Sequence, residues 1–164
     1  MKSFLKSAVF SLCILGFFVF VCMYVTGLSG GGGGGGGATG INPEAGEAIY
    51  WGDGQCHTCH SIGTSGSATR GPNQEGLAAR AEERAKEAGL SSGLEYLVES
   101  IVDPSAFVVE GYDNIMPKVY DAPIMLGREQ IQAVLTYLQT LGGEPNIEAV
   151  AKYAEKIPEA SGDA

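Results

Sequence analysis

The chain has 164 residues, enough for about one ordinary domain besides a short apolar segment. It carries 19 acidic residues against 10 basic ones, a net charge of −9, and this balance excludes nucleic acid as a partner because a polyphosphate requires a basic surface. Four cysteines are too few for a disulfide scaffold, and the 25 glycines follow no collagen period.

The uncharged apolar segment 8–28 predicts a transmembrane helix, because a helix of this length spans about 31 Å and a hydrocarbon core is about 30 Å thick. Lys2 and Lys6 precede the segment, so the positive-inside rule places the N-terminus in the cytoplasm. We therefore expect residues 1–28 to be a single-pass anchor in the cell membrane that meets the lipid bilayer through residues 8–28. The alternative is a cleaved signal peptide, whose apolar region is usually shorter.

Composition divides the remainder into three parts. Residues 29–41 contain an unbroken glycine run from 30 to 37, and such a sequence forms a flexible linker. Residues 42–143 are expected to form the main domain, on the extracytoplasmic (periplasmic) side of the membrane. Residues 144–164 are expected to form an amphipathic helix, over 147–157, followed by an acidic tail.

Local signals in the main domain predict an all-α fold. Asn42 is a capping residue, Pro43 suits the first helical position, and the helix is expected to end near Trp51. Further helices are predicted over 77–88, from Ser91 or Ser92 to Asp103, and over 128–141, where apolar residues recur at helical spacing. The loops 61–76 and 106–127 are long for a compact domain unless they surround something, and a large apolar cofactor would meet that requirement.

The segment Cys56-His57-Thr58-Cys59-His60 has the C-x-x-C-H pattern of c-type heme attachment. Cys56 and Cys59 can each form a thioether to the porphyrin, and His60 is placed to be the proximal ligand of the iron. A zinc site would need a second ligand pair, and no Cys or His follows His60. A thioredoxin-like dithiol would need a βαβ pattern, and a plain disulfide would leave His60 without a role. The motif therefore predicts one covalent heme c, with His57 as a filler residue.

The sixth iron ligand must come from another residue type, because the chain has only two histidines. Met116 and Met125 are the candidates after the motif. Met116 precedes Pro117 in a segment predicted to be an irregular loop, where a side chain can turn inward without interrupting a helix. Met125 lies just before the last helix of the domain, where packing is the ordinary role of Met. We therefore expect Met116 to be the ligand, with metal ligation by His60 and Met116.

Four segments together resemble the class I cytochrome c family, over roughly residues 43–143; they are Cys56–His60, Arg70-Gly71-Pro72-Asn73, Tyr112-Asp113-Asn114-Ile115-Met116-Pro117 and Tyr137-Leu138-Gln139-Thr140-Leu141. The resemblance implies Met116 as the distal ligand. It also implies that the carbonyl of Pro72 accepts a hydrogen bond from the proximal histidine. The family fold further implies that the first helix, near Gly46 and Tyr50, crosses the last helix near Leu135 and Leu138. Gln74-Glu75-Gly76 depart from the family pattern, which often has Leu directly after Asn73.

These observations predict a membrane-tethered monoheme cytochrome that carries single electrons in a respiratory or photosynthetic chain. They do not predict an enzyme that acts on a small-molecule substrate. Membrane redox complexes would be its electron donor and acceptor. Three segments resemble monoheme cytochrome subunits of respiratory membrane complexes; they are residues 77–92, Ser100-Ile101-Val102-Asp103-Pro104 and Met116-Pro117-Lys118. The alternative is a heme-based sensor or gas-binding protein, which would need a displaceable sixth ligand.

Overall fold

The computed structural model describes residues 11–21 and 40–161, which belong to two separate compact units. Residues 11–21 are helical, and the side chains of 11–20 are exposed. No helix within these described residues is both long and apolar enough to cross a bilayer. The rest of the predicted anchor, and residues 29–39 of the predicted linker, lie outside the described residues.

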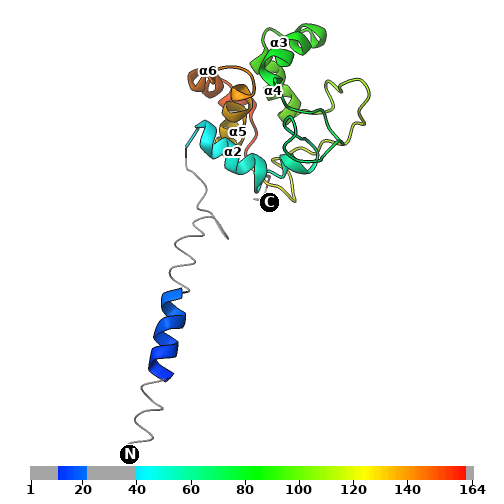
Figure 1. Ribbon diagram of the computed structural model, residues 1–164. Helices are drawn as coiled ribbons and strands as arrows, with labels where there is room; N and C mark the ends of the chain where they lie inside the picture. Colours follow the sequence, from blue (N-terminus) through cyan, green and yellow to red (C-terminus); the bar gives the residue numbers. More distant parts are fainter. Residues whose placement is uncertain (1–10, 22–39, 162–164) are drawn as a thin grey trace, which may run out of the picture. The chain divides into compact units, whose positions relative to one another are not determined.

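Residues 40–161 are helical, and their described backbone contains no strand, only an isolated bridge between Ile62 and Ser65 (Figure 1). The helices longer than one turn are α2 (Pro43–Trp51), α3 (Leu77–Ala88), α4 (Gly93–Val102), α5 (Arg128–Thr140) and α6 (Ile147–Ala151). Short 3-10 helices occur at η1 (Cys56–Thr58) and η2 (Ala154–Lys156). The all-α prediction for this domain is therefore confirmed.

The capping signals act as the sequence predicts. The side chain of Asn42 accepts a hydrogen bond of 2.8 Å from the backbone N–H of Ala45, and Pro43 occupies the start of α2. Ser92 likewise accepts a bond of 3.2 Å from the N–H of Glu95 at the start of α4. Each cap satisfies a backbone donor that the first helical turn leaves without a partner, and so fixes where the helix begins.

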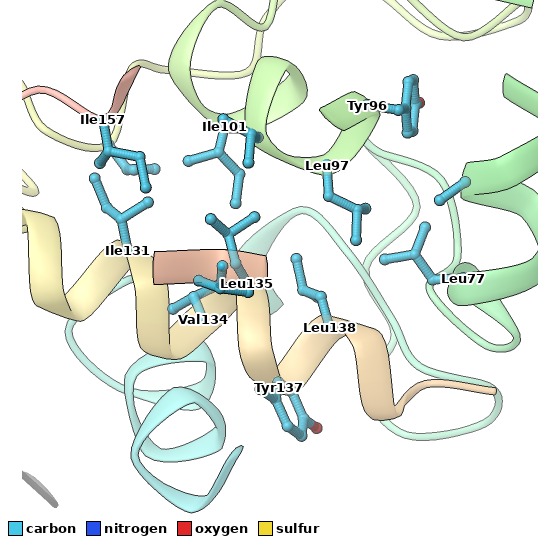
Figure 2. Close-up of a cluster of buried hydrophobic side chains, with 14 of the residues drawn as sticks. Leu77, Tyr96, Leu97, Ile101, Ile131, Val134, Leu135, Tyr137, Leu138 and Ile157 are labelled. Carbon is cyan, nitrogen blue, oxygen red and sulfur yellow. The ribbon is translucent and has the colours of Figure 1, made fainter. Parts of the chain in front are cut away.

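The predicted apolar stripe of α5 forms the centre of the core. In Figure 2 its side chains face Leu97 and Ile101 of α4, and Ile157 of the C-terminal segment approaches from the other end. The stripe residues Ile131, Val134, Leu135 and Leu138 are all buried. Because this one helix contacts α2, α3, α4 and α6, it holds the remaining elements in place.

Helix α2 packs closely across α5, and Gly46 is the point of nearest approach (Figure 1). A Cβ atom added at Gly46 would lie 2.0 Å from the carbonyl oxygen of Ala133 and 2.7 Å from the Cβ of Tyr137. The family resemblance implies a crossing near Leu135 and Leu138. In the structure it lies nearer to Ala133 and Tyr137. One turn further along α2, the ring of Tyr50 packs edge-on against Tyr137 with centroids 5.6 Å apart.

The C-terminal segment differs from its prediction. The helix expected over 147–157 ends at Ala151, and the chain continues through η2 to an extended Ile157. Pro158 follows Ile157, and the residue before a proline disfavours the helical conformation. Val150 and Ile157 are fully buried against the domain, and the carbonyl of Ile157 accepts a bond of 2.9 Å from Arg128. Val150 and Ile157 are thus covered by their own domain, whereas Ile147 is exposed.

The helix crossing makes a prediction about stability. Replacing Gly46 by Ala adds a methyl group against backbone atoms that no rotamer change can move. Overpacking of this kind costs about 1–3 kcal/mol, which outweighs the gain of about 1 kcal/mol from better helix propensity. We expect denaturant unfolding of the heme-loaded G46A protein to show a net loss of stability.

The matched control is Gly127→Ala. Its added Cβ would meet its nearest atom at 3.7 Å, and the substitution should cost less than about 1 kcal/mol. A G46A protein as stable as wild type would contradict this prediction, because it would show that α2 and α5 can move apart enough to accept the methyl group without loss of stability.

Candidate functional site

The C-x-x-C-H motif forms one tight turn directly after α2. Gly54 donates a backbone bond to the carbonyl of Ile49, and Gln55 then takes a left-handed conformation with φ of 53°. The backbone N–H groups of Cys59 and His60 both donate to the carbonyl of Cys56, which closes the turn. Cys56 and Cys59 are not joined in a disulfide.

The environment of Cys56 argues against dithiol redox chemistry. Burial raises the pKa of the Cys56 thiol to about 11. A reactive dithiol requires the opposite shift, since the thiolate is the nucleophile and catalytic cysteines have lowered pKa values. Cys56 is therefore poorly suited to the thioredoxin-like role that the sequence leaves as an alternative.

The motif opens onto a cavity of about 420 Å³. Its wall combines the motif, the loop 70–74, helices α3 to α5, and the loop 104–124. The apolar lining includes Leu77, Leu97, Ile101, Phe107, Val119 and Leu138. All five residues predicted for the site, Cys56, Cys59, His60, Pro72 and Met116, line this one cavity.

The structure distinguishes the two methionines and the two histidines. Met116 lines the cavity and is half-buried, whereas Met125 is 42 % exposed and does not line it. His60 lines the cavity, whereas the ring of His57 lies beside Trp51 with centroids 5.6 Å apart. Of each pair, the residue singled out by the sequence is the one that faces the cavity.

The ring of His60 is oriented by a backbone oxygen. Its Nδ1 atom lies 2.8 Å from the carbonyl oxygen of Pro72, and a carbonyl can only accept, so Nδ1 carries the proton. Burial lowers the pKa of His60 from its ordinary value, and the bond to Pro72 offsets part of that shift. Because the net shift is downward, the neutral imidazole is favoured. With the proton on Nδ1, Nε2 carries the lone pair, the form in which histidine binds a metal.

A missing side chain makes room for that ring. Gly71 is buried against His60, and a Cβ atom at this position would lie 2.4 Å from Cε1 and 2.7 Å from Nδ1. The backbone N–H of Gly71 also donates a bond of 2.9 Å to the carbonyl of Cys59. The loop therefore packs flat on the imidazole and is tied to the motif itself.

Asn73 holds the rest of this loop, a role that the sequence does not reveal. Its Oδ1 accepts bonds from the N–H groups of Gly63 (3.0 Å) and Glu75 (2.9 Å). Its Nδ2 donates to the hydroxyl of Ser61 (3.1 Å) and the carbonyl of Gly63 (2.8 Å). One amide thus joins the segment after His60 to the segment after Pro72. The only sequence signal is its position directly after Pro72.

Two further contacts of His60 were also missed. The hydroxyl of Tyr50 donates to the His60 carbonyl at 3.2 Å, and the amide of Gln74 lies 2.7 Å from His60 Nδ1. Gln74 is one of the three residues that depart from the expected family pattern. The resemblance therefore did not predict that its side chain lies beside the imidazole of His60.

The cavity fits a large, mainly apolar group with a metal at its centre. Among the described residues, the buried side-chain polar atoms without a hydrogen-bond partner are Ser100 Oγ and Gln74 Oε1, and both residues line the cavity. The thiols of Cys56 and Cys59 can form thioethers to a porphyrin, and the neutral imidazole of His60 and the thioether of Met116 are ligands that suit its iron.

Comparison with known proteins identifies the family. The family model described as Cytochrome c matches residues 43–142, which is more than half of the chain. No curated protein matches the chain. The motif, the cavity around it and the extent of this match lead to one conclusion: the chain belongs to the cytochrome c family, as a class I c-type cytochrome that carries electrons on the iron of a covalently bound heme c.

Proposed function

We propose that this protein is a membrane-tethered monoheme cytochrome c that passes single electrons between membrane redox complexes of a respiratory or photosynthetic chain. The observation that carries the proposal is the single cavity onto which Cys56, Cys59, His60 and Met116 all open. The protein acts alone or as a subunit of a larger oxidoreductase complex.

Each residue has a distinct task in this proposal. Cys56 and Cys59 would hold the heme through thioethers, and His60 and Met116 would bind its iron. Bound heme supplies one iron that cycles between the ferrous and ferric states. The Pro72 carbonyl fixes the tautomer and orientation of His60.

Three exposed residues at the rim of the cavity support a route by which electrons could enter and leave. Val108, Tyr112 and Ile115 line the cavity and are 39 %, 37 % and 46 % exposed. The cavity therefore reaches the molecular surface along residues 108–115. A partner that docks at this rim comes close to the heme without entering the protein, and no substrate pocket is needed for electron transfer.

The ligand assignment is tested by comparing two methionine variants. Loss of the sulfur ligand should remove the weak near-infrared Fe(III)–sulfur absorption and allow carbon monoxide to bind the ferrous protein. We expect both changes in Met116→Ala and neither in Met125→Ala, because Met125 lies outside the cavity. The wild-type protein should stay six-coordinate in both redox states. Carbon monoxide binding to the wild type would favour the sensor alternative, and the same spectral changes in M125A would refute the assignment.

The tether is proposed from the N-terminal sequence and the exposure of its described part. The apolar side chains at positions 12, 14, 15 and 17–20 are each 49–70 % exposed. Exposed apolar area on this scale marks a surface that something else covers. A lipid bilayer fits, because the uncharged segment 8–28 has the required length and basic residues flank only its N-terminal side. The glycine run then lets the heme domain reorient near the membrane.

Cell fractionation tests the anchor directly. The full chain, produced in a bacterium that attaches heme c, should remain with the membranes after a high-salt wash. A matched chain with a cleavable signal peptide in place of residues 1–28 should appear in the soluble periplasmic fraction with the same visible spectrum. Recovery of the full chain in the soluble fraction, shortened at its N-terminus, would instead identify residues 1–28 as a signal peptide.

A further inference from the structure

The Nδ1 atom of His60 has two polar neighbours at hydrogen-bond distance. The carbonyl oxygen of Pro72 lies at 2.8 Å, and the amide Nε2 of Gln74 lies at 2.7 Å. Because the carbonyl can only accept, Nδ1 carries a proton and has no lone pair left to accept a bond from an amide N–H. A donor facing this nitrogen would therefore repel it.

The conflict disappears when the Gln74 amide is rotated by half a turn. The nitrogen and oxygen of a side-chain amide have nearly the same shape, so their assignment follows from the hydrogen-bond network. In the rotated orientation Oε1 faces Nδ1–H and can accept a bond from it, while Nε2 takes the place of the buried Oε1. The assigned Oε1 is buried with no partner among the described residues, so the rotation breaks no existing bond.

The backbone holds Gln74 in this position. Its N–H donates a bond of 2.7 Å to the carbonyl of Ser61, and its carbonyl accepts a bond of 3.1 Å from Leu77 at the start of α3. The neighbouring Asn73 joins the loop to Gly63 through its side chain. The position of the Gln74 backbone beside the imidazole of His60 is therefore fixed by contacts that do not involve the Gln74 side chain.

We propose that Gln74 is a positioning residue for the proximal ligand: its amide oxygen accepts a second hydrogen bond from the His60 Nδ1–H that also donates to Pro72. This rests on the proposed ligation of iron by His60. A second acceptor draws the proton further from the ring and increases the negative charge that the imidazole offers to iron. That charge stabilises the ferric state, so Gln74 lowers the reduction potential.

The test compares Gln74→Leu with wild type in the full heme-loaded protein. Leu has a similar size and no acceptor. We expect a higher midpoint potential and an upfield shift of the Nδ1–H proton in the NMR spectrum of the reduced protein. That proton should exchange with solvent about fivefold faster, the factor expected for the loss of one net hydrogen bond.

Two further variants separate this role from a general loss of stability. Gln132→Leu makes the same chemical change at a buried amide of α5, whose Nε2 donates to the Val150 carbonyl at 3.5 Å and which does not line the cavity. It should leave the potential and the Nδ1–H signal unchanged. Gln74→Glu keeps an oxygen at the same reach, and it should retain slow Nδ1–H exchange and a potential no higher than that of wild type.

The outcomes distinguish this proposal from the one on which it rests. If Q74L matches wild type in both potential and Nδ1–H signal while His60 ligates the iron, the role of Gln74 is refuted and the function stands. An equal rise in potential in Q132L would also refute it, because stability alone would then explain the shift. A wild-type protein whose heme is not bound by His60 would overturn both proposals.

Discussion

The bond between His60 Nδ1–H and the carbonyl of Pro72, 2.8 Å long, is the contact on which the site depends. It decides which ring nitrogen carries the proton and therefore which one faces the cavity with a lone pair. Around it the chain leaves out a side chain at Gly71 and ties that loop to the motif through the Cys59 carbonyl. The side chain of Asn73 then joins the loop to Gly63 through two hydrogen bonds. The ring of His60 is thus held mainly by backbone groups, whose positions change little with side-chain motion.

The two halves of the domain serve different purposes. Helices α2 and α5 cross with backbone atoms close enough to exclude a methyl group at Gly46, and this crossing is a rigid support for the motif turn that follows α2. The opposite side, over residues 104–124, is irregular and partly exposed. It carries Met116 and the cavity rim. A rigid proximal side and an accessible distal side suit a protein that must keep its iron geometry constant while a partner docks nearby.

Local signals in the sequence predicted most of the elements. Asn42 and Ser92 cap the helices that follow them, and the stripe from Ile131 to Leu138 is the buried face of α5. The heme motif, and the preference for Met116 over Met125, agree with what faces the cavity. The missed features are contacts between distant residues. The bonds of Asn73 and Gln74 to residues 60–63, and of Arg128 to Ile157, join segments whose proximity no short window encodes. The end predicted for the 147–157 helix was wrong for a local reason, because Pro158 disfavours the helical conformation at Ile157.

The crossing of α2 with α5 also joins the two ends of the domain. The two helices are far apart in the chain, and the segment between them carries the motif, the loop 70–74 and Met116. A chain truncated before residue 128 would therefore keep every residue of the motif and lose the helix on which α2 packs. The pattern alone, in a shortened polypeptide, is thus not enough to build the site.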